Sequence, residues 1–359
     1  MTTVKKISQL GLVAAAIMLA LILLFYSRAD AQAQIVSIPC GQDIDAKINA
    51  DPKTTSTRFV LGADCTFTAS ATLVPGHLDE VVCAIPPTFT QRGPALDPSV
   101  RCHVAGPSVG VVFDPVGPSG SLAKVYFEGF EITGGNFDGS SQSGTAIHGG
   151  KVHDDSRFYG LYIRNNDAAG IQSGRGIFER IELTNNSTDS RTLGFNAAGL
   201  KARHEIEVKN SYVHDTQANG LWCDNGCFDT SRNVFWVHHN LVVKNGRAGI
   251  RWEKVPSTGG EALIEHNEVH GNSYAAGGGG ITVRDAKDAI IQYNRFGAVN
   301  IAAVNYEKNT NRAIFASDSG RSDRPDLLNI DILNNTLNGE VIKGCELPDA
   351  LVACTGNTP

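Results

Sequence analysis

Charged and aromatic side chains recur at two fixed positions of five related segments between residues 169 and 284. The segments are "AGIQSG" at 169, "AGLKAR" at 198, "NGLWCD" at 219, "AGIRWE" at 248 and "GGITVR" at 279. The second residue after the shared glycine is Gln172, Lys201, Trp222, Arg251 or Thr282, and the fourth is Gly174, Arg203, Asp224, Glu253 or Arg284. Cations, carboxylates and one tryptophan therefore share these two positions.

These residue types suit the chemistry of an acidic sugar polymer. Carboxylates can transfer protons or chelate a cation, and arginine or lysine can neutralise a sugar carboxylate. We take Asp224, Glu253, Arg251 and Arg284 as the catalytic candidates, and Lys201, Arg203 and Trp222 as the substrate-binding candidates. We expect an exposed Trp222 that stacks on a sugar ring. The alternative is a solvated ladder of ion pairs between neighbouring strands.

The alternation within each segment predicts a β-strand with one inward and one outward face. The inward positions read Ile171, Leu200, Leu221, Ile250 and Ile281, then Ser173, Ala202, Cys223, Trp252 and Val283. Trp252 is much larger than the other members of its column, so we predict a local bulge there. If the strands stack in parallel, equivalent residues lie about 4.8 Å apart and the two outward positions form one surface.

A second pattern lies between these segments: it begins at a turn-like residue and carries apolar residues at alternate positions. It ends at Asn165, Asn185, Asp215, Asn245 and Asn272. The shared glycines are spaced by 29, 21, 29 and 31 residues. Short strands at this period, with no clear helix between them, favour a parallel β-solenoid with asparagine ladders at its corners. We expect His204, His214, His238, His239 and His266 to be corner and ladder residues rather than catalytic bases.

The repeats "NGLWCD…HHNLVVKNG" and "AGIRWE…EHNEVHGN" resemble the right-handed parallel β-helix superfamily, which includes pectate lyases, polygalacturonases and mannuronan epimerases. The resemblance covers about residues 35 to 340. It implies an all-β fold with a short N-terminal cap helix, and "DIDAKINA" fits such a helix with Ile44 and Ile48 on one side. The "NTD", "GHG", "RIK" and "DPH" motifs of these enzymes are absent. No catalytic residue is therefore transferred from them.

The resemblance and the outward residues together predict a protein that acts on an anionic polysaccharide or a cell-surface glycan, as a uronan lyase, an epimerase-like enzyme or a glycosidase. The alternative is a non-catalytic glycan-binding or structural surface protein. We expect a monomer. We also expect no binding of nucleic acid, since the formal net charge is −6. The metal ligands are unknown; calcium is the one cofactor considered, with Asp138, Asp154 and Asp155 as acidic residues that could bind it.

All eight cysteines follow residue 33, and an even number in an exported chain favours disulfides over a zinc site. Pairing of nearest neighbours gives Cys40–Cys65, Cys83–Cys102, Cys223–Cys227 and Cys345–Cys354. Eight cysteines allow 105 connectivities, so the sequence alone does not fix this one.

The N-terminus carries Lys5 and Lys6, then an apolar run over 10–26 and small residues near 29–33. This layout is typical of a secretory signal peptide, and an uncleaved membrane anchor is the alternative. Either way we expect the rest of the chain to be secreted or extracytoplasmic. The predicted parts are the signal or anchor (1–33), an N-terminal cap with the first coils (34–130), the β-helix coils (131–340) and a disulfide-closed tail (341–359).

Overall fold

The computed structural model describes residues 33–140, 143–193, 197–224, 227, 234–253, 261–273, 278–301, 303–310, 312–318, 327–348 and 351–359. Apart from its last residue, the predicted signal peptide lies outside this part of the chain. No helix among the described residues is long and apolar enough to cross a membrane. The account below concerns the compact unit Ile35–Pro359.

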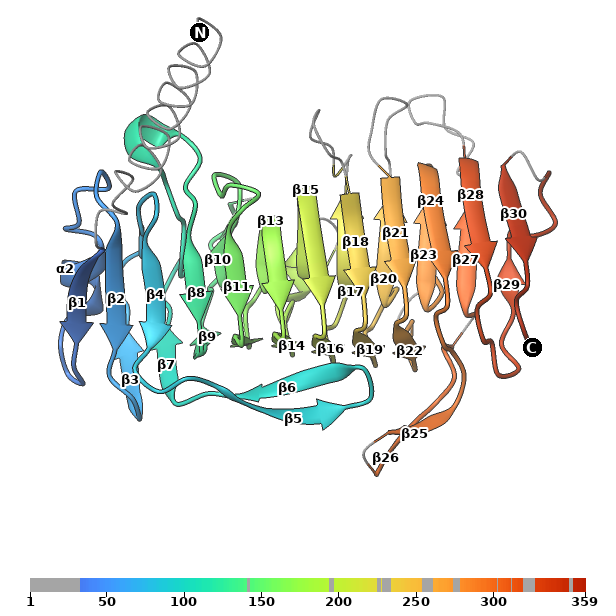
Figure 1. Ribbon diagram of the computed structural model, residues 1–359, viewed down its shortest axis with the longest axis horizontal. Helices are drawn as coiled ribbons and strands as arrows, with labels where there is room; N and C mark the ends of the chain where they lie inside the picture. The colour runs from blue at the N-terminus through green and yellow to red at the C-terminus, as the bar shows by residue number, and fades with distance from the viewer. Residues whose placement is uncertain are drawn as a thin grey trace, which may run out of the picture. The chain divides into compact units, whose positions relative to one another are not determined.

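The chain is a right-handed parallel β-helix, in which each coil contributes one strand to each of three faces, and the strands within a face run parallel (Figure 1). Face 1 contains β10 (Ile147–His148), β13 (Ile171–Glu179), β15 (Ala198–Lys209), β17 (Asn219–Asp224), β20 (Ile250–Glu253), β23 (Ile281–Arg284), β27 (Ile314–Ser317) and β29 (Ile342–Lys343). Strands β13 and β15 are long enough to run on into the second face, which joins the two faces into one sheet.

Face 2 starts at β1 (Gln34–Ile38) and shares β13 and β15 with face 1. Its other strands are β2 (Thr57–Leu61), β4 (Glu80–Cys83), β8 (Tyr126–Glu128), β11 (Arg157–Tyr159), β18 (Val234–His238), β21 (Glu261–Glu265), β24 (Lys287–Gln292), β28 (Leu328–Leu333) and β30 (Val352–Thr355). Face 3 contains β3 (Cys65–Thr68), β7 (Cys102–Ala105), β9 (Phe130–Thr133), β12 (Tyr162–Arg164), β14 (Glu182–Thr184), β16 (Tyr212–His214), β19 (Leu241–Val243) and β22 (Glu268–His270).

The core is filled by stacked inward side chains, as the alternation predicts. Ile171 pairs with Leu200 and Leu221 pairs with Ile250, and all four are completely buried. The bulge predicted at Trp252 is wrong: Cys223, Trp252 and Val283 stay in continuous register. Trp252 fits inside because its indole stacks on Phe235 and donates a hydrogen bond to the Lys287 carbonyl at 3.0 Å. The register shifts instead lie in β13, between Gln172 and Gly176.

Two asparagine ladders hold the corners, which confirms the predicted use of asparagine. One ladder follows face 2 and contains Asn240, Asn267, Asn294, Asn335 and Asn357. The other follows face 3 and runs from Asn245 through Asn272 and Asn309 to Glu340. The predicted positions were one residue too early in three coils, where Asn165, Asn185 and Asp215 lie directly before the ladder position.

All four disulfides are present in the nearest-neighbour arrangement that the spacing predicts. A five-residue helix, α2 (Ile44–Ile48), begins after Asp43, whose side chain caps it by accepting from the Ala46 amide at 3.0 Å. Ile44 and Ile48 are buried in the core. Its role as a cap of the first coil stays a prediction, as does the capping role of the Cys345–Cys354 segment.

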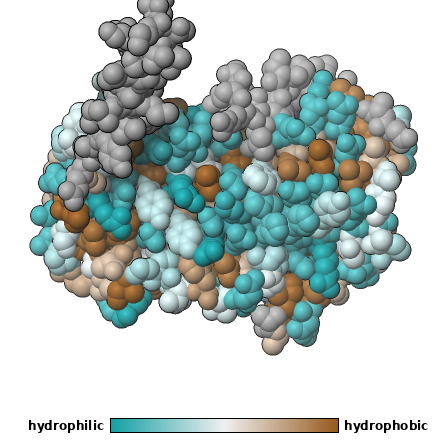
Figure 2. Space-filling model, in the orientation of Figure 1, coloured by the Kyte–Doolittle hydropathy of each residue, from teal (hydrophilic) through white to brown (hydrophobic). Residues whose placement is uncertain are grey.

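Two antiparallel hairpins leave the coils, and neither was predicted. One is β5 (Thr88–Arg92) with β6 (Ala95–Ser99), which runs along the bottom of Figure 1 beneath later coils. The other is β25 (Val299–Ile301) with β26 (Val304–Tyr306). Ala95, Ile301 and Tyr306 pack with Tyr212 and Leu241 in a second small apolar cluster outside face 3. On the face of the molecule in Figure 2, hydrophilic residues surround small, separate groups of apolar ones.

Candidate functional site

The outer side of face 1 brings the predicted site residues together. Lys201 pairs with Trp222, Trp222 with Arg251, and Arg251 with Thr282. The neighbouring column pairs Asp224 with Glu253 and Glu253 with Arg284. Gly174 does not continue this column, because the irregular register of β13 places it beside Ala202. We call seven outward residues of this face the strip: Lys201, Arg203, Trp222, Asp224, Arg251, Glu253 and Arg284.

Each carboxylate of the strip is tied to cations. The Lys201 ammonium lies 2.9 Å from Asp224, and the Arg203 guanidinium lies 4.0 Å from the same carboxylate. The Arg251 guanidinium lies 2.8 Å from Glu253. Both carboxylates therefore face positive charge. That suits a group that holds cations in place better than one that donates a proton.

Trp222 links the two ion pairs into one network. Its indole N–H donates to Glu253 at 3.2 Å. The Lys201 ammonium lies 4.4 Å from the ring centre and the Arg251 guanidinium carbon lies 5.6 Å from it. Both distances fit cation–π attraction. The Trp222 indole therefore already contacts Lys201, Arg251 and Glu253 of the same chain.

The expectation of an exposed Trp222 is wrong. Only 6% of the residue is accessible, and Lys201 is 1% accessible. Stacking in register between two long cationic side chains covers the ring, which alternation along one strand could not reveal. The accessible cations are Arg203 and Arg284, with side chains 46% and 42% exposed, while Arg251 retains 17%. A solute that approaches the strip therefore meets arginines first.

The same outer side of face 1 extends to earlier coils that sequence reasoning did not include. Arg175 is buried and its guanidinium lies 3.0 Å from Asp154 and 2.7 Å from the His204 ring. His148 pairs in register with Gln172, which pairs with Lys201. His148 accordingly belongs to the same column as Lys201 and Trp222. Ile147 and His148 do show the apolar–polar alternation, but their segment lacks the glycine that marked the other five.

The acidic residues considered for calcium have protein partners. Asp154 holds Arg175, Asp155 lies 3.7 Å from Lys124, and Asp138 accepts from the Ser140 amide at 2.8 Å. Across the described ranges, no group of three or more histidine, cysteine, aspartate or glutamate side chains is arranged to hold a metal ion.

Several of the histidines form corner and ladder contacts, as expected. His239, His266 and Tyr293 occupy successive corners, with ring centres 5.1 Å apart at each step. His238 hydrogen-bonds Glu207 at 3.1 Å, and His214 hydrogen-bonds Glu182 at 2.9 Å. His204 differs because it contacts Arg175, beside the strip.

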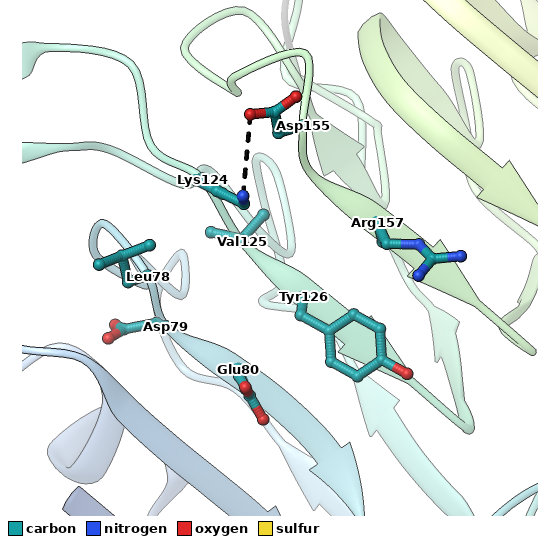
Figure 3. Close-up of a pocket in the computed structure, with 8 residues that line it drawn as sticks. All are labelled: Leu78, Asp79, Glu80, Lys124, Val125, Tyr126, Asp155 and Arg157. Carbon is teal, nitrogen blue, oxygen red and sulfur yellow. Dashed lines mark ion pairs between the residues drawn. The ribbon is translucent and has the colours of Figure 1, made fainter. Parts of the chain in front are cut away.

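A separate pocket of about 200 Å³ opens on the outer side of face 2 (Figure 3). Glu80, Tyr126 and Arg157 stand side by side on β4, β8 and β11, and the Lys124–Asp155 ion pair borders them. Asp79 also lines this pocket, and burial raises its pKa to about 6. Its carboxylate accepts from the Thr57 amide at 3.1 Å and from the Gly76 amide. Asp79 thus anchors the start of β2.

No protein-family model matches the chain, and no curated protein matches its sequence. Solved structures do match its fold. The A-module of mannuronan C-5 epimerase AlgE4 from Azotobacter vinelandii aligns with a TM-score of 0.52 at 12% identity, over 88% of this chain and 91% of that one. Both chains are therefore matched over most of their length.

Two further solved structures agree with this match. The catalytic domain of a GH87 alpha-1,3-glucanase in complex with nigerose gives a TM-score of 0.51 at 12% identity, over 90% of this chain and 69% of that one. Pectate lyase Pel9A gives 0.50 at 11% identity, over 91% and 80%. At such identities the likeness establishes the parallel β-helix fold and no more. The names of all three describe proteins that act on or bind saccharides.

Proposed function

We propose that this protein binds an anionic polysaccharide along the strip and acts on its uronate residues as a lyase or epimerase-like enzyme. The observation that carries the proposal is the row of cations on one outer face, in which Lys201, Arg251 and Arg203 are held in register by two carboxylates. The structural neighbours named above work on polysaccharides, which supports the same substrate class.

The chemistry follows from the requirements of a uronate. The proton on carbon 5 is acidic enough to remove only when the adjacent carboxylate is neutralised. Fixed arginines do this without reorganising during the reaction, because Glu253 and Asp224 already hold the cations in place. Arg203 and Arg284 are exposed enough to meet a sugar carboxylate directly. In this proposal Asp224 and Glu253 position the cations rather than transfer protons.

A second candidate function is glycan binding without catalysis. It is favoured by one observation: both carboxylates of the strip are engaged by cations, and Glu253 also accepts from the indole of Trp222. A glycosidase needs one carboxyl group as an acid and another as a base or nucleophile. Two carboxylates that are both bound by cations serve that mechanism poorly.

We place the protein outside the cytoplasm. Its four disulfides fit an oxidising compartment. Export through a signal peptide within residues 1–33, or tethering by an uncleaved segment there, is part of this proposal, and so is a monomeric state.

The test is incubation with polygalacturonate, alginate and other uronans, with and without calcium. A lyase produces unsaturated uronates, which absorb in the ultraviolet, and an epimerase incorporates solvent deuterium at carbon 5 without cleavage. Arg203→Ala and Arg284→Ala should weaken binding of the uronan, and Arg58→Ala, an exposed arginine on face 2, should not. Saturable binding with no product from any uronan would favour the non-catalytic alternative.

A further inference from the structure

We propose that His148 is the general base of the reaction and that Asp114 positions it; this inference rests on the proposed uronan chemistry. The Nδ1 atom of His148 lies 2.9 Å from the Asp114 carboxylate. A carboxylate at Nδ1 fixes the tautomer in which that nitrogen carries the proton. Nε2 is then the free basic nitrogen, and no described residue forms a hydrogen bond with it.

His148 lies in line with the binding residues. It is on β10, and its register partner Gln172 on β13 is in turn the partner of Lys201 on β15. Two strand spacings, about 10 Å, separate His148 from Lys201 along the stack. A polysaccharide that follows the strip along face 1 therefore passes over His148 as well.

The edge of the imidazole is left open by a glycine. A Cβ atom at Gly150 would lie 2.9 Å from Cε1 and 3.0 Å from Nε2 of His148. Any other residue there would cover the nitrogen that the proposal needs. The His148 side chain is 10% exposed, so it is held firmly and still reachable at one edge.

The other basic groups beside the strip are engaged. Asp224 and Glu253 are bound by Lys201 and Arg251. The His204 Nδ1 atom accepts from the Arg175 guanidinium at 2.7 Å. His148 differs because its partner is the Asp114 carboxylate at Nδ1, which leaves Nε2 open.

The step balances with water as the only co-reactant. His148 Nε2 takes the proton from carbon 5, and the electron pair of that bond forms the double bond between carbons 4 and 5. The bond from carbon 4 to the leaving oxygen breaks, and that oxygen takes a proton from water. His148 then returns its proton to the hydroxide. The cations of the strip stabilise the negative charge that develops on the uronate carboxylate.

The experiment compares His148→Gln, Asp114→Asn and the control His153→Gln with the wild type, on the uronan that the wild type turns over. His153 is a half-exposed histidine five residues further on, outside the strip. Product formation and deuterium exchange at carbon 5 are measured beside uronan binding. We expect His148→Gln to lower kcat by about 100- to 10,000-fold with binding retained, and His153→Gln to change neither.

The Asp114→Asn variant tests whether Asp114 positions His148 for the reaction or only stabilises the fold. Asparagine can donate to Nδ1 as well as accept from it, so the tautomer of His148 is no longer fixed; kcat should fall while the KM for the uronan stays near the wild-type value. Normal turnover and exchange in a folded His148→Gln variant would overturn the inference and leave the proposed function standing. No product and no exchange from the wild type on any uronan would overturn both.

Discussion

At the scale of single residues, the strip depends on buried ion pairs rather than on free charges. Asp224→Asn removes the charge that faces the Lys201 ammonium at 2.9 Å, and both side chains are almost inaccessible. Removing one partner of a buried ion pair costs about 3–5 kcal/mol. We therefore expect the free energy of unfolding, measured by urea titration, to fall by that amount.

The matched control is Glu80→Gln, which removes an exposed cross-strand partner of Arg58. That loss should be within about 1 kcal/mol. A double variant, Asp224→Asn with Lys201→Met, should recover much of the stability because neither charge of the buried pair remains. Equal effects of Asp224→Asn and Glu80→Gln would show that burial does not set the strength of the pair.

The residue columns of the strip could be predicted from the sequence, whereas the burial of Trp222 by its neighbours could not. Alternation fixes which way Trp222 and Asp224 point. It does not show that Lys201 and Arg251 lie against the indole, because contacts between coils depend on side-chain conformation. His148 escaped notice for a related reason: its partner Asp114 is 34 residues away and no local motif links them.

At the scale of elements, the β5–β6 hairpin covers a titrating cluster on face 3. Burial, opposed by a hydrogen bond to His214 and assisted by one to Asp97 of the hairpin, raises the pKa of Glu182 to about 7. Burial alone would lower the pKa of His214, but hydrogen bonds to Asp215 and Glu182 outweigh it and raise the pKa. Arg92 of the hairpin and Tyr162 also face this cluster.

Both shifts make the folded state bind protons more strongly than the unfolded state. The His214 contribution to stability is complete below the ordinary imidazole pKa of 6.5 and is lost as the pH rises through its raised pKa. The Glu182 contribution is complete below the ordinary carboxyl pKa of 4.5 and is lost as the pH rises through about 7. Glu182→Gln should remove much of this slope in urea titrations from pH 4.5 to 7. The control is Glu268→Gln, which removes a carboxyl whose pKa is lowered: burial alone would raise the pKa of Glu268, but a hydrogen bond to His270 outweighs burial. That variant should remove a rise of stability with pH that lies below about pH 4.5, and it should leave the slope from pH 4.5 to 7 unchanged. Parallel curves for the wild type and Glu182→Gln would refute the linkage.

Neither hairpin could be found from periodicity, because both interrupt the repeat instead of continuing it. The β5–β6 hairpin nevertheless ties an early coil to later ones, since its Leu96 amide donates to the Asn210 carbonyl at 2.9 Å. The coils themselves were predictable, since the core requires an apolar residue at every inward position.

At the scale of the whole molecule, stability is a sum over stacked coils, so the same change should cost more in the middle than at an end. In the ladder along face 2, Asn267 accepts from the backbone and side-chain amides of Asn240 and donates to Asn294. Asn267→Ala leaves buried groups unsatisfied on both sides. At about 1–3 kcal/mol for each such group, urea titration should show a large loss.

Asn357 is the matched end position. It accepts from Asn335 in the same way but is the last rung, and it is partly exposed, so water can replace the lost hydrogen bond. Asn357→Ala should therefore cost clearly less than Asn267→Ala, and amide exchange should accelerate only in the final coil. In Asn267→Ala, exchange should accelerate in the coils on both sides, because each coil is held by its neighbours. Equal losses from the two variants would mean that the β-helix unfolds without regard to the position of the damaged coil.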